Sequence, residues 1–248
     1  MMLNETTASM LHEMKLSVMA VTFREQCADP KFSDLSFEER LGMIVDAEWI
    51  SRKNKRLTRL IRKAGYDITG AAVEDIEYHV DRKLDKSQIT RLSTCAYIQE
   101  CHNIIILGAT GNGKTYLASA FGMAANRNFC TVRYIRLPDL LGELAIAHGE
   151  GNYQKVVKQY KQVKLLILDE WLLFPISDTN AMDLLDVINA RHKRASTIFC
   201  SQFPPEGWYQ KINEPTVADA IVDRIVHDSY TILIHGTGMR ERKGIAQE

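Results

Sequence analysis

Gly108-Ala109-Thr110-Gly111-Asn112-Gly113-Lys114-Thr115 matches the pattern G-x-x-x-x-G-K-[ST] of a phosphate-binding loop, and this motif indicates the class of fold to expect. A loop that wraps a phosphate turns tightly and directs successive backbone N–H groups inward, which glycine permits. A short β-branched run at 103–107 precedes the loop, and a helical pattern at 114–126 follows it. A strand before the loop and a helix after it form the setting in which this motif binds phosphate.

The loop therefore predicts a site for ATP. We expect Lys114 to contact the β- and γ-phosphates and the Thr115 hydroxyl to bind Mg²⁺. The alternative is a glycine turn between a strand and a helix with no ligand. The residues that we expect to hold the phosphates are Gly108, Ala109, Thr110, Gly111, Asn112, Gly113, Lys114 and Thr115.

Strand and helix patterns alternate along the chain after the loop. This alternation predicts an α/β fold, with a parallel sheet flanked by helices on both faces. The expected strands are 103–107, 131–137, 163–168, 197–200 and 230–234, and the expected helices are 114–126, a stretch from Pro138, 180–194 and 216–227.

Two acidic residues end the strongly apolar strand predicted at 163–168. Asp169 is the candidate Mg²⁺-supporting carboxylate, because an apolar strand that ends in Asp beside a phosphate-binding loop has this role. Glu170 is the candidate general base that polarises the attacking water. Acidic residues also end strands at protein surfaces with no such role. With the loop upstream, the two acids together favour ATP hydrolysis over a pure nucleotide switch.

The first hundred residues are predicted to be helical. A helical stripe runs from Glu5 to about Gln26, and a second helix is expected from Ser36 to about Ala64. Ser36 and Glu39 form a capping-box pattern, and Gly65 is a typical residue after a helix end. We therefore expect a small all-helical N-terminal domain at 1–70 for DNA or partner binding, and an ATPase domain at 71–248.

The end of the second helix carries a basic face. Five basic residues recur at steps of three and four, so they lie on one side of a helix. Such a face would neutralise several DNA phosphates and would position the protein without reading sequence. The alternative is a solvated helix face. The candidate DNA contacts are Arg52, Lys55, Arg56, Arg59 and Lys63.

Composition limits the class of protein. Lys and Arg together number 31 and Asp and Glu together 31, so the formal net charge is zero and the basic face is a local feature. The longest apolar stretch is shorter than the roughly 20 residues that span a bilayer, so we expect no membrane partner and a cytoplasmic location. The 5 cysteines lack the spacing of a metal site or redox pair.

The assembled pattern resembles AAA+ ATPases, and within them the DnaC-like helicase loaders and the IstB-type transposition helper ATPases of insertion sequences. The IstB-type match is the closer one and covers nearly the whole chain. Its motifs are the phosphate-binding loop, Leu168-Asp169-Glu170, Cys200-Ser201-Gln202 with Pro204-Pro205 and Trp208, Asp223-Arg224-Ile225-Val226-His227, and Gly236-Thr237-Gly238-Met239-Arg240.

This resemblance implies further roles. It assigns Gln202 to the sensor that reads the γ-phosphate, Arg224 to an arginine finger acting on ATP of a neighbouring subunit, and Arg240 to a second sensor near the nucleotide. It also implies that a second basic series faces the interior of a ring, which makes Lys158 and Lys161 candidate DNA contacts. Each residue also has a simpler reading, as a surface ion-pair partner, a solvated basic residue or a strand-end amide.

The resemblance implies an ATPase that forms homo-oligomers on double-stranded DNA when ATP is bound. Its purpose would be to select or remodel target DNA and to recruit a cognate transposase. One alternative is a helicase loader, which shares these motifs and uses its N-terminal region to grip a helicase. Another is a P-loop kinase for a small molecule, which would need an acceptor pocket and no arginine from a neighbour.

Overall fold

The chain divides into two compact units. The computed structural model describes residues 2–236 and 238–242. The units are Met1–Arg59 and Leu60–Glu248. The division falls within the long helix α3 (Phe37–Ala64), whereas the predicted boundary at residue 70 lies beyond the end of that helix. The functional division at residue 70 stays a prediction.

The first unit is helical, as predicted, but its first helix is broken. The expected helix from Glu5 to Gln26 is wrong, because α1 (Met2–Glu13) and α2 (Ser17–Ala28) are separate and pack against each other. Lys15 between them adopts a left-handed backbone with φ 60°, and the Leu16 N–H bonds back to the carbonyl of Leu11. The apolar periodicity continues through this turn, so it does not reveal the break. A short 3₁₀ helix, η1 (Pro30–Phe32), follows.

Helix α3 begins and ends as the sequence predicts. The Glu39 carboxylate accepts a hydrogen bond from the Ser36 N–H at 2.8 Å, and the Ser36 hydroxyl accepts one from the Glu39 N–H at 3.2 Å, which confirms the capping box. Gly65 follows the last helical residue, Ala64.

The second unit contains a five-stranded parallel sheet in the order β2-β3-β4-β1-β5. The predicted alternation of strands and helices and the parallel sheet are confirmed. The strands are β1 (Asn103–Gly108), β2 (Val132–Arg136), β3 (Leu165–Asp169), β4 (Ser196–Ser201) and β5 (Ser229–Ile234).

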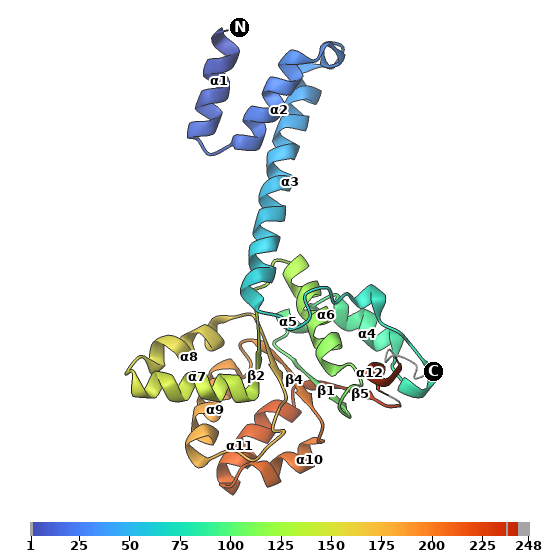
Figure 1. The fold of residues 1–248 in the computed structure, drawn as a ribbon, viewed down its shortest axis with the longest axis vertical. Helices are drawn as coiled ribbons and strands as arrows, with labels where there is room; N and C mark the ends of the chain where they lie inside the picture. Colours follow the sequence, from blue (N-terminus) through green and yellow to red (C-terminus); the bar gives the residue numbers. More distant parts are fainter. Residues whose placement is uncertain (1, 237, 243–248) are drawn as a thin grey trace, which may run out of the picture. The chain divides into compact units, whose positions relative to one another are not determined.

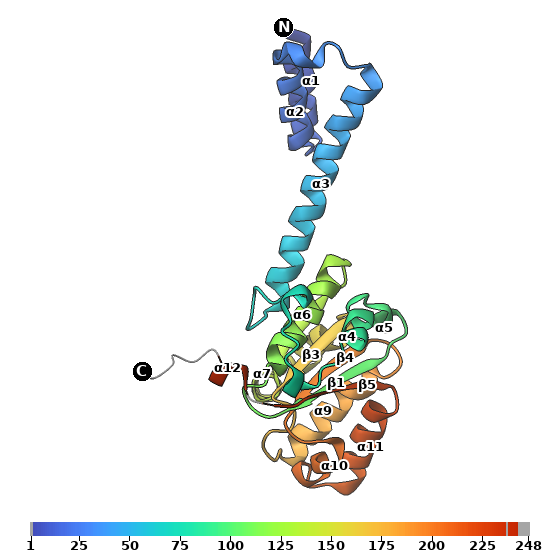
Figure 2. The ribbon, with the colours of Figure 1, turned by 90° about the vertical axis from the view of Figure 1, so that its right-hand side faces the viewer.

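Helices cover both faces of this sheet (Figures 1 and 2), and a hydrophobic cluster lies on each face. On one face lie α4 (Lys86–Ser93), α5 (Ala96–Gln99) and α6 (Lys114–Arg127). On the other lie α7 (Leu137–Gly149), α8 (Tyr153–Gln162), α9 (Asp178–Arg191), α10 (Pro205–Trp208) and α11 (Pro215–Val226). The remaining helical pieces are η2 (Val73–Asp75), η3 (Val80–Arg82), η4 (Tyr209–Lys211) and α12 (Met239–Arg242).

Alternation along β3 decides which face its last residue joins. Leu166 and Leu168 belong to the cluster with α7 and α9, whereas Leu165 and Ile167 belong to the cluster with α6. Because side chains alternate along a strand, Asp169 shares the face of Leu165 and Ile167. The carboxylate at the end of β3 therefore lies on the side of the sheet where α6 begins.

One buried arginine ties the elements of the opposite face together. Arg191 at the end of α9 is 2% exposed, and its guanidinium donates to the carbonyls of Tyr160, Val163 and Ser196 and to the Thr197 hydroxyl. Burial lowers the pKa of Arg191 to about 9, so the side chain is still charged at neutral pH. It links the end of α8, the end of α9 and the start of β4.

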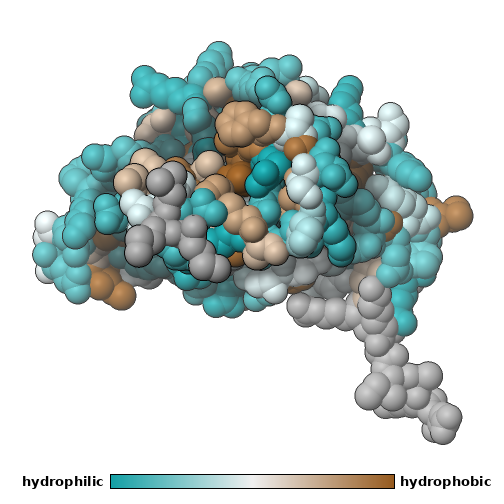
Figure 3. Space-filling model, turned by 90° about the horizontal axis from the view of Figure 1, so that it is seen from above, coloured by the Kyte–Doolittle hydropathy of each residue, from teal (hydrophilic) through white to brown (hydrophobic). Residues whose placement is uncertain are grey.

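Among residues 2–236 and 238–242, no helix has the length and apolarity needed to cross a membrane. In the face of the molecule seen in Figure 3, hydrophilic side chains predominate and hydrophobic ones occupy a limited part.

Arg191→Ala is expected to lower the free energy of unfolding by about 3 kcal/mol or more, since it leaves several buried acceptors without a donor, each costing about 1–3 kcal/mol. Urea denaturation followed by circular dichroism measures this change. The control is Arg194→Ala, which removes an exposed arginine three positions along and should change stability by less than about 0.5 kcal/mol. Equal effects of the two variants would contradict the assignment.

Candidate functional site

The predicted phosphate-binding loop joins β1 to α6. Gly111 and Gly113 have φ angles of 84° and 92°, a left-handed backbone that residues with a Cβ rarely adopt. The Lys114 ammonium donates to the carbonyls of Gly108 at 2.7 Å and Ala109 at 2.9 Å. Lys114 therefore lies across its own loop, with the N-terminus of α6 behind it, and this arrangement provides the positive end of a helix for an anion.

Three contacts from distant segments hold the loop. The Asn112 amide is 3% exposed and donates to the Ile234 carbonyl of β5 at 3.2 Å. The Met239 N–H of α12 donates to the Gly111 carbonyl at 2.8 Å. The Arg82 guanidinium donates to the Asn112 carbonyl at 3.0 Å. The shape of the loop thus depends on segments before β1 and after β5.

Arg82 is a site residue that the sequence analysis missed. Its side chain is 5% exposed, and it also donates to the carbonyl of Glu77, so one guanidinium joins the loop to the segment at 77–82. Burial lowers the pKa of Arg82, and the negative charge of Glu77 opposes that effect. No motif or spacing marks this arginine, because its partners are backbone carbonyls and the one in the loop lies 30 positions away in the sequence.

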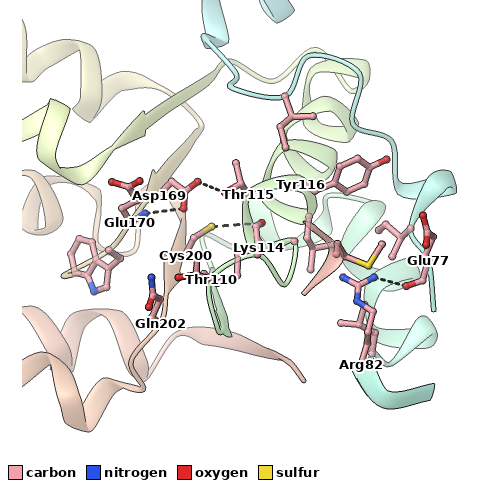
Figure 4. A pocket seen from close by; sticks show the side chains of 18 of the residues that line it. Glu77, Arg82, Thr110, Lys114, Thr115, Tyr116, Asp169, Glu170, Cys200 and Gln202 are labelled. Carbon is pink, nitrogen blue, oxygen red and sulfur yellow. Dashed lines mark hydrogen bonds between the residues drawn. The ribbon is translucent and has the colours of Figure 1, made fainter. Parts of the chain in front are cut away.

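The Asp169 carboxylate lies against the start of α6 (Figure 4). Its Oδ2 accepts hydrogen bonds from the Thr115 hydroxyl at 2.6 Å and from the Tyr134 hydroxyl at 2.9 Å, and its Oδ1 accepts one from the Glu170 N–H at 2.8 Å. Burial is the main cause that raises the pKa of Tyr134, with Asp169 adding to it. The hydroxyl oxygen of Thr115 and the carboxylate oxygens of Asp169 are hard donors of the kind that Mg²⁺ prefers, so these two residues fit such an ion and would hold it.

Glu170 and Gln202 follow the ends of neighbouring strands. Glu170 comes directly after β3 with φ 54°, an unusual conformation for a residue with a side chain. Gln202 comes directly after β4. Both line one cavity of about 480 Å³ together with Lys114, Thr115 and Asp169. Figure 4 shows Asp169, Glu170 and Gln202 on one side of the loop, and Glu77 and Arg82 on the other.

The same cavity also has apolar lining residues that were not foreseen from the sequence, beside the polar Asp75, Glu77 and Arg82. The apolar residues come from the segment before β1, from α6 and from α12. A flat aromatic base beside a phosphate site requires such a lining. The residues are Ile68, Ile76, Leu84, Tyr116 and Met239.

Comparisons with known proteins agree with this geometry. The family model of IstB-like ATP binding proteins matches residues 9–246. The chain belongs to this family. A putative insertion sequence ATP-binding protein of Sinorhizobium fredii is 36% identical over 242 residues, covering 98% of both chains. The putative ATP-binding protein of insertion sequence IS1162 of Pseudomonas fluorescens is 39% identical over 203 residues, covering 82% of this chain and 88% of its own.

Solved structures with the same fold are more distant in sequence. The crystal structure of the DnaC helicase loader has a TM-score of 0.57 at 18% identity and covers 66% of this chain and 96% of its own. AMPPCP-bound DnaA from Aquifex aeolicus has a TM-score of 0.58 at 20% identity and covers 69% of this chain and 52% of its own. These likenesses show the fold alone. The predicted membership of the IstB-type ATP-binding proteins is confirmed by the family model, and the predicted fold is confirmed by these structures.

Arg224, the predicted arginine finger, lies away from the nucleotide cavity of its own chain. It is half-buried on α11, donates to the Ala220 carbonyl at 2.7 Å and lines a separate shallow groove with Tyr209 and His227. Among the described residues, those that line the nucleotide cavity do not include it. Arg240 lies in α12, but its side chain is outside the part that the structure describes.

All five residues of the basic face predicted on α3 are exposed, namely Arg52, Lys55, Arg56, Arg59 and Lys63. The guanidinium of Arg52 is held by contacts within the first unit. It donates to Glu48 at 2.7 Å and to the Lys15 carbonyl at 2.7 Å. The hydrogen bond from Arg52 is the main cause that lowers the pKa of Glu48. Glu48 accepts in turn from the first N–H groups of α2. Arg52 thus helps to cap α2 within the first unit.

The second basic series lies on α8, and one of its two candidate residues also has a carboxylate partner. Lys158 is exposed, whereas the Lys161 ammonium forms an ion pair with Asp186 of α9 at 2.8 Å. Because α8 packs against α9, the positive charge of Lys161 is paired with a carboxylate within the fold. Both residues stay candidate DNA contacts, with Lys158 the more accessible one.

Arg82→Gln is expected to weaken nucleotide binding at least about tenfold, because the phosphate-binding loop loses a donor to the Asn112 carbonyl worth about 1.5–3 kcal/mol. Titration of a fluorescent ATP analogue measures the dissociation constant. The control is Arg127→Gln, which removes only an exposed ion pair with Glu74 at 3.3 Å. An unchanged dissociation constant for Arg82→Gln would show that the other two contacts suffice to hold the loop.

Proposed function

We propose that this protein binds Mg²⁺–ATP in the cavity between the loop and β3, and that it hydrolyses ATP only when a second copy completes the site. Lys114 would bind the phosphates, Glu170 would act as general base, and Gln202 would orient the attacking water. Thr115 and Asp169 would hold Mg²⁺, which would neutralise the charge that develops on the phosphates.

The observation that carries this proposal is the separation of Arg224 from the rest of the site. The phosphate loop, both acids and Gln202 line one cavity, whereas Arg224 lines another groove on α11. An arginine that stabilises transferring phosphate can come from a neighbouring molecule. ATP would then bridge two copies, so the assembly would form with ATP and dissociate after hydrolysis.

We further propose that the assembly forms on double-stranded DNA. The N-terminal region 1–70 would present the basic face of Lys55, Arg56, Arg59 and Lys63 to the phosphates, and Lys158 of α8 would add a second contact. Arg52 and Lys161 would act mainly through their carboxylate partners. Contacts of this kind neutralise phosphates without reading bases, so the affinity would fall steeply with salt.

The relatives are named as insertion sequence proteins, which supports a role in moving such an element. In this role the assembly would mark or remodel target DNA and recruit a cognate transposase. The helicase-loader and kinase alternatives stay distinguishable through the substrate on which the protein assembles.

Lys114→Ala and Arg224→Ala are each expected to lower ATP hydrolysis at least about a hundredfold. An equimolar mixture should recover part of the activity, because an intact loop on one copy can meet an intact arginine on another. Phosphate release at a fixed total protein concentration measures this recovery. Arg194→Ala, an exposed arginine that no proposed site uses, is the control and should keep wild-type activity.

A mixture no more active than its components would contradict the arginine in trans. An Arg224→Ala variant with unchanged ATPase rate and oligomer size would contradict the proposal that two copies share the site.

Particle mass is expected to rise well above the monomer only when ATP and a duplex of about two hundred base pairs are both present. Analytical ultracentrifugation at several salt concentrations measures it. Lys55→Gln and Arg59→Gln should each reduce the slope of log affinity against log salt by about 0.9, since each removes one phosphate contact. Lys31→Gln, an exposed lysine in the same unit, should leave the slope unchanged.

A monomer under every condition would favour a small-molecule kinase. Assembly restricted to single-stranded DNA would favour a helicase loader. Either result would overturn the transposition reading.

A further inference from the structure

Tyr134 makes a side-chain contact to the metal-binding carboxylate that the reaction scheme above does not use. Its side chain is 7% exposed, and its hydroxyl donates to Asp169 Oδ2 at 2.9 Å. The same oxygen accepts from the Thr115 hydroxyl at 2.6 Å. One carboxylate oxygen is therefore held from two directions, by the sheet through Tyr134 and by the start of α6 through Thr115.

The strand register explains why this tyrosine reaches the carboxylate. β2 and β3 are parallel neighbours, with Tyr134 opposite Ile167 and Arg136 opposite Asp169. Tyr134 and Ile167 share the face of the sheet that α6 covers. Asp169, two residues after Ile167, lies on that face too, so a side chain as long as tyrosine spans the offset along the strands.

Cys200 of β4 also contacts Asp169 from within the sheet, but Cys200 lines the nucleotide cavity and Tyr134 does not. Asp169 Oδ1 accepts from the Glu170 N–H, which belongs to the turn after β3, and Thr115 belongs to the phosphate loop end of α6. Both of these partners border the nucleotide cavity. Tyr134 does not line the cavity, so nucleotide cannot replace its hydrogen bond directly.

We propose that Tyr134 is a positioning residue, which orients the Asp169 carboxylate toward Thr115 so that the two oxygens together accept the divalent cation accompanying ATP. This inference rests on the proposed function. Groups that hydrogen-bond to a metal ligand from behind fix its orientation, and their loss costs about 10–100-fold in metal affinity or activity.

The competing explanation is that Tyr134 is a core side chain whose hydroxyl bonds to the nearest acceptor. Tyr66 supplies a matched comparison. It is also 7% exposed, and its hydroxyl donates to Asn126 Oδ1 at 2.7 Å, on the same face of the sheet. Tyr66 does not line the nucleotide cavity and does not contact Asp169 in the described structure.

The experiment compares Tyr134→Phe with Tyr66→Phe in the full chain. Each change removes one buried hydroxyl and keeps the ring. Binding of a fluorescent ATP analogue is titrated at increasing Mg²⁺ and again in EDTA, and Mn²⁺ binding to the nucleotide complex is followed by electron paramagnetic resonance. Urea denaturation reports the stability of both variants.

For Tyr134→Phe, the Mg²⁺ concentration at half-maximal effect should rise about 10-fold or more, with Mn²⁺ affinity falling in parallel. Nucleotide affinity in EDTA should stay within about twofold of wild type. Tyr66→Phe should leave the metal dependence unchanged, although it removes a comparable hydrogen bond.

Metal dependence of Tyr134→Phe within about twofold of wild type would overturn the inference, as would an equal shift in Tyr66→Phe. A wild-type protein whose nucleotide binding and hydrolysis ignore Mg²⁺ would overturn the proposed function as well. The two failures are therefore distinguishable by the behaviour of the wild type.

Discussion

The nucleotide site depends on the hydrogen bond from Thr115 to Asp169, which joins the end of the phosphate-binding loop to the end of β3. Thr115 belongs to α6, which the glycine loop starts, and Asp169 ends β3, two strands away from β1 in the sheet. A pair of oxygens 2.6 Å apart arises only if the sheet order, the strand alternation and the start of the helix are all correct. The cavity, the carboxylates and the apolar pocket for a base are arranged around this bond.

Much of this arrangement follows from short-range patterns in the sequence. Residues 108–115, the apolar run before Asp169 and the Ser36–Glu39 cap each act through neighbours within a few positions, and each has the predicted local structure. Arg82, Tyr134 and Met239 could not be found in this way, because their partners lie far along the chain and are mostly backbone groups. The break at Lys15 is a local feature, and it was missed because no glycine marks its left-handed turn.

The spacing of basic residues predicted which side chains are exposed on a helix, but it did not predict which of them are paired with a carboxylate. Lys55, Arg59 and Lys158 are exposed, as a DNA contact requires. Arg52 and Lys161 match the same spacing, yet carboxylates of Glu48 and Asp186 hold them. Helical spacing reports the direction in which a side chain leaves its helix. For Lys161 the spacing carries no information about Asp186 on α9, whereas Glu48 lies four positions before Arg52 on the same helix and could have been found from the spacing.

The anchoring of the loop by β5 also has a consequence for the order of events during synthesis on the ribosome. Asn112 bonds to Ile234, which is made 122 residues later, and β1 lies between β4 and β5, both of which follow it in the chain. The nascent chain therefore carries a complete phosphate-binding motif before β5 and α12, which supply two of the three contacts that hold the loop, have been made. The loop can take its final shape only late in synthesis, so the phosphate site is among the last parts of the fold to form.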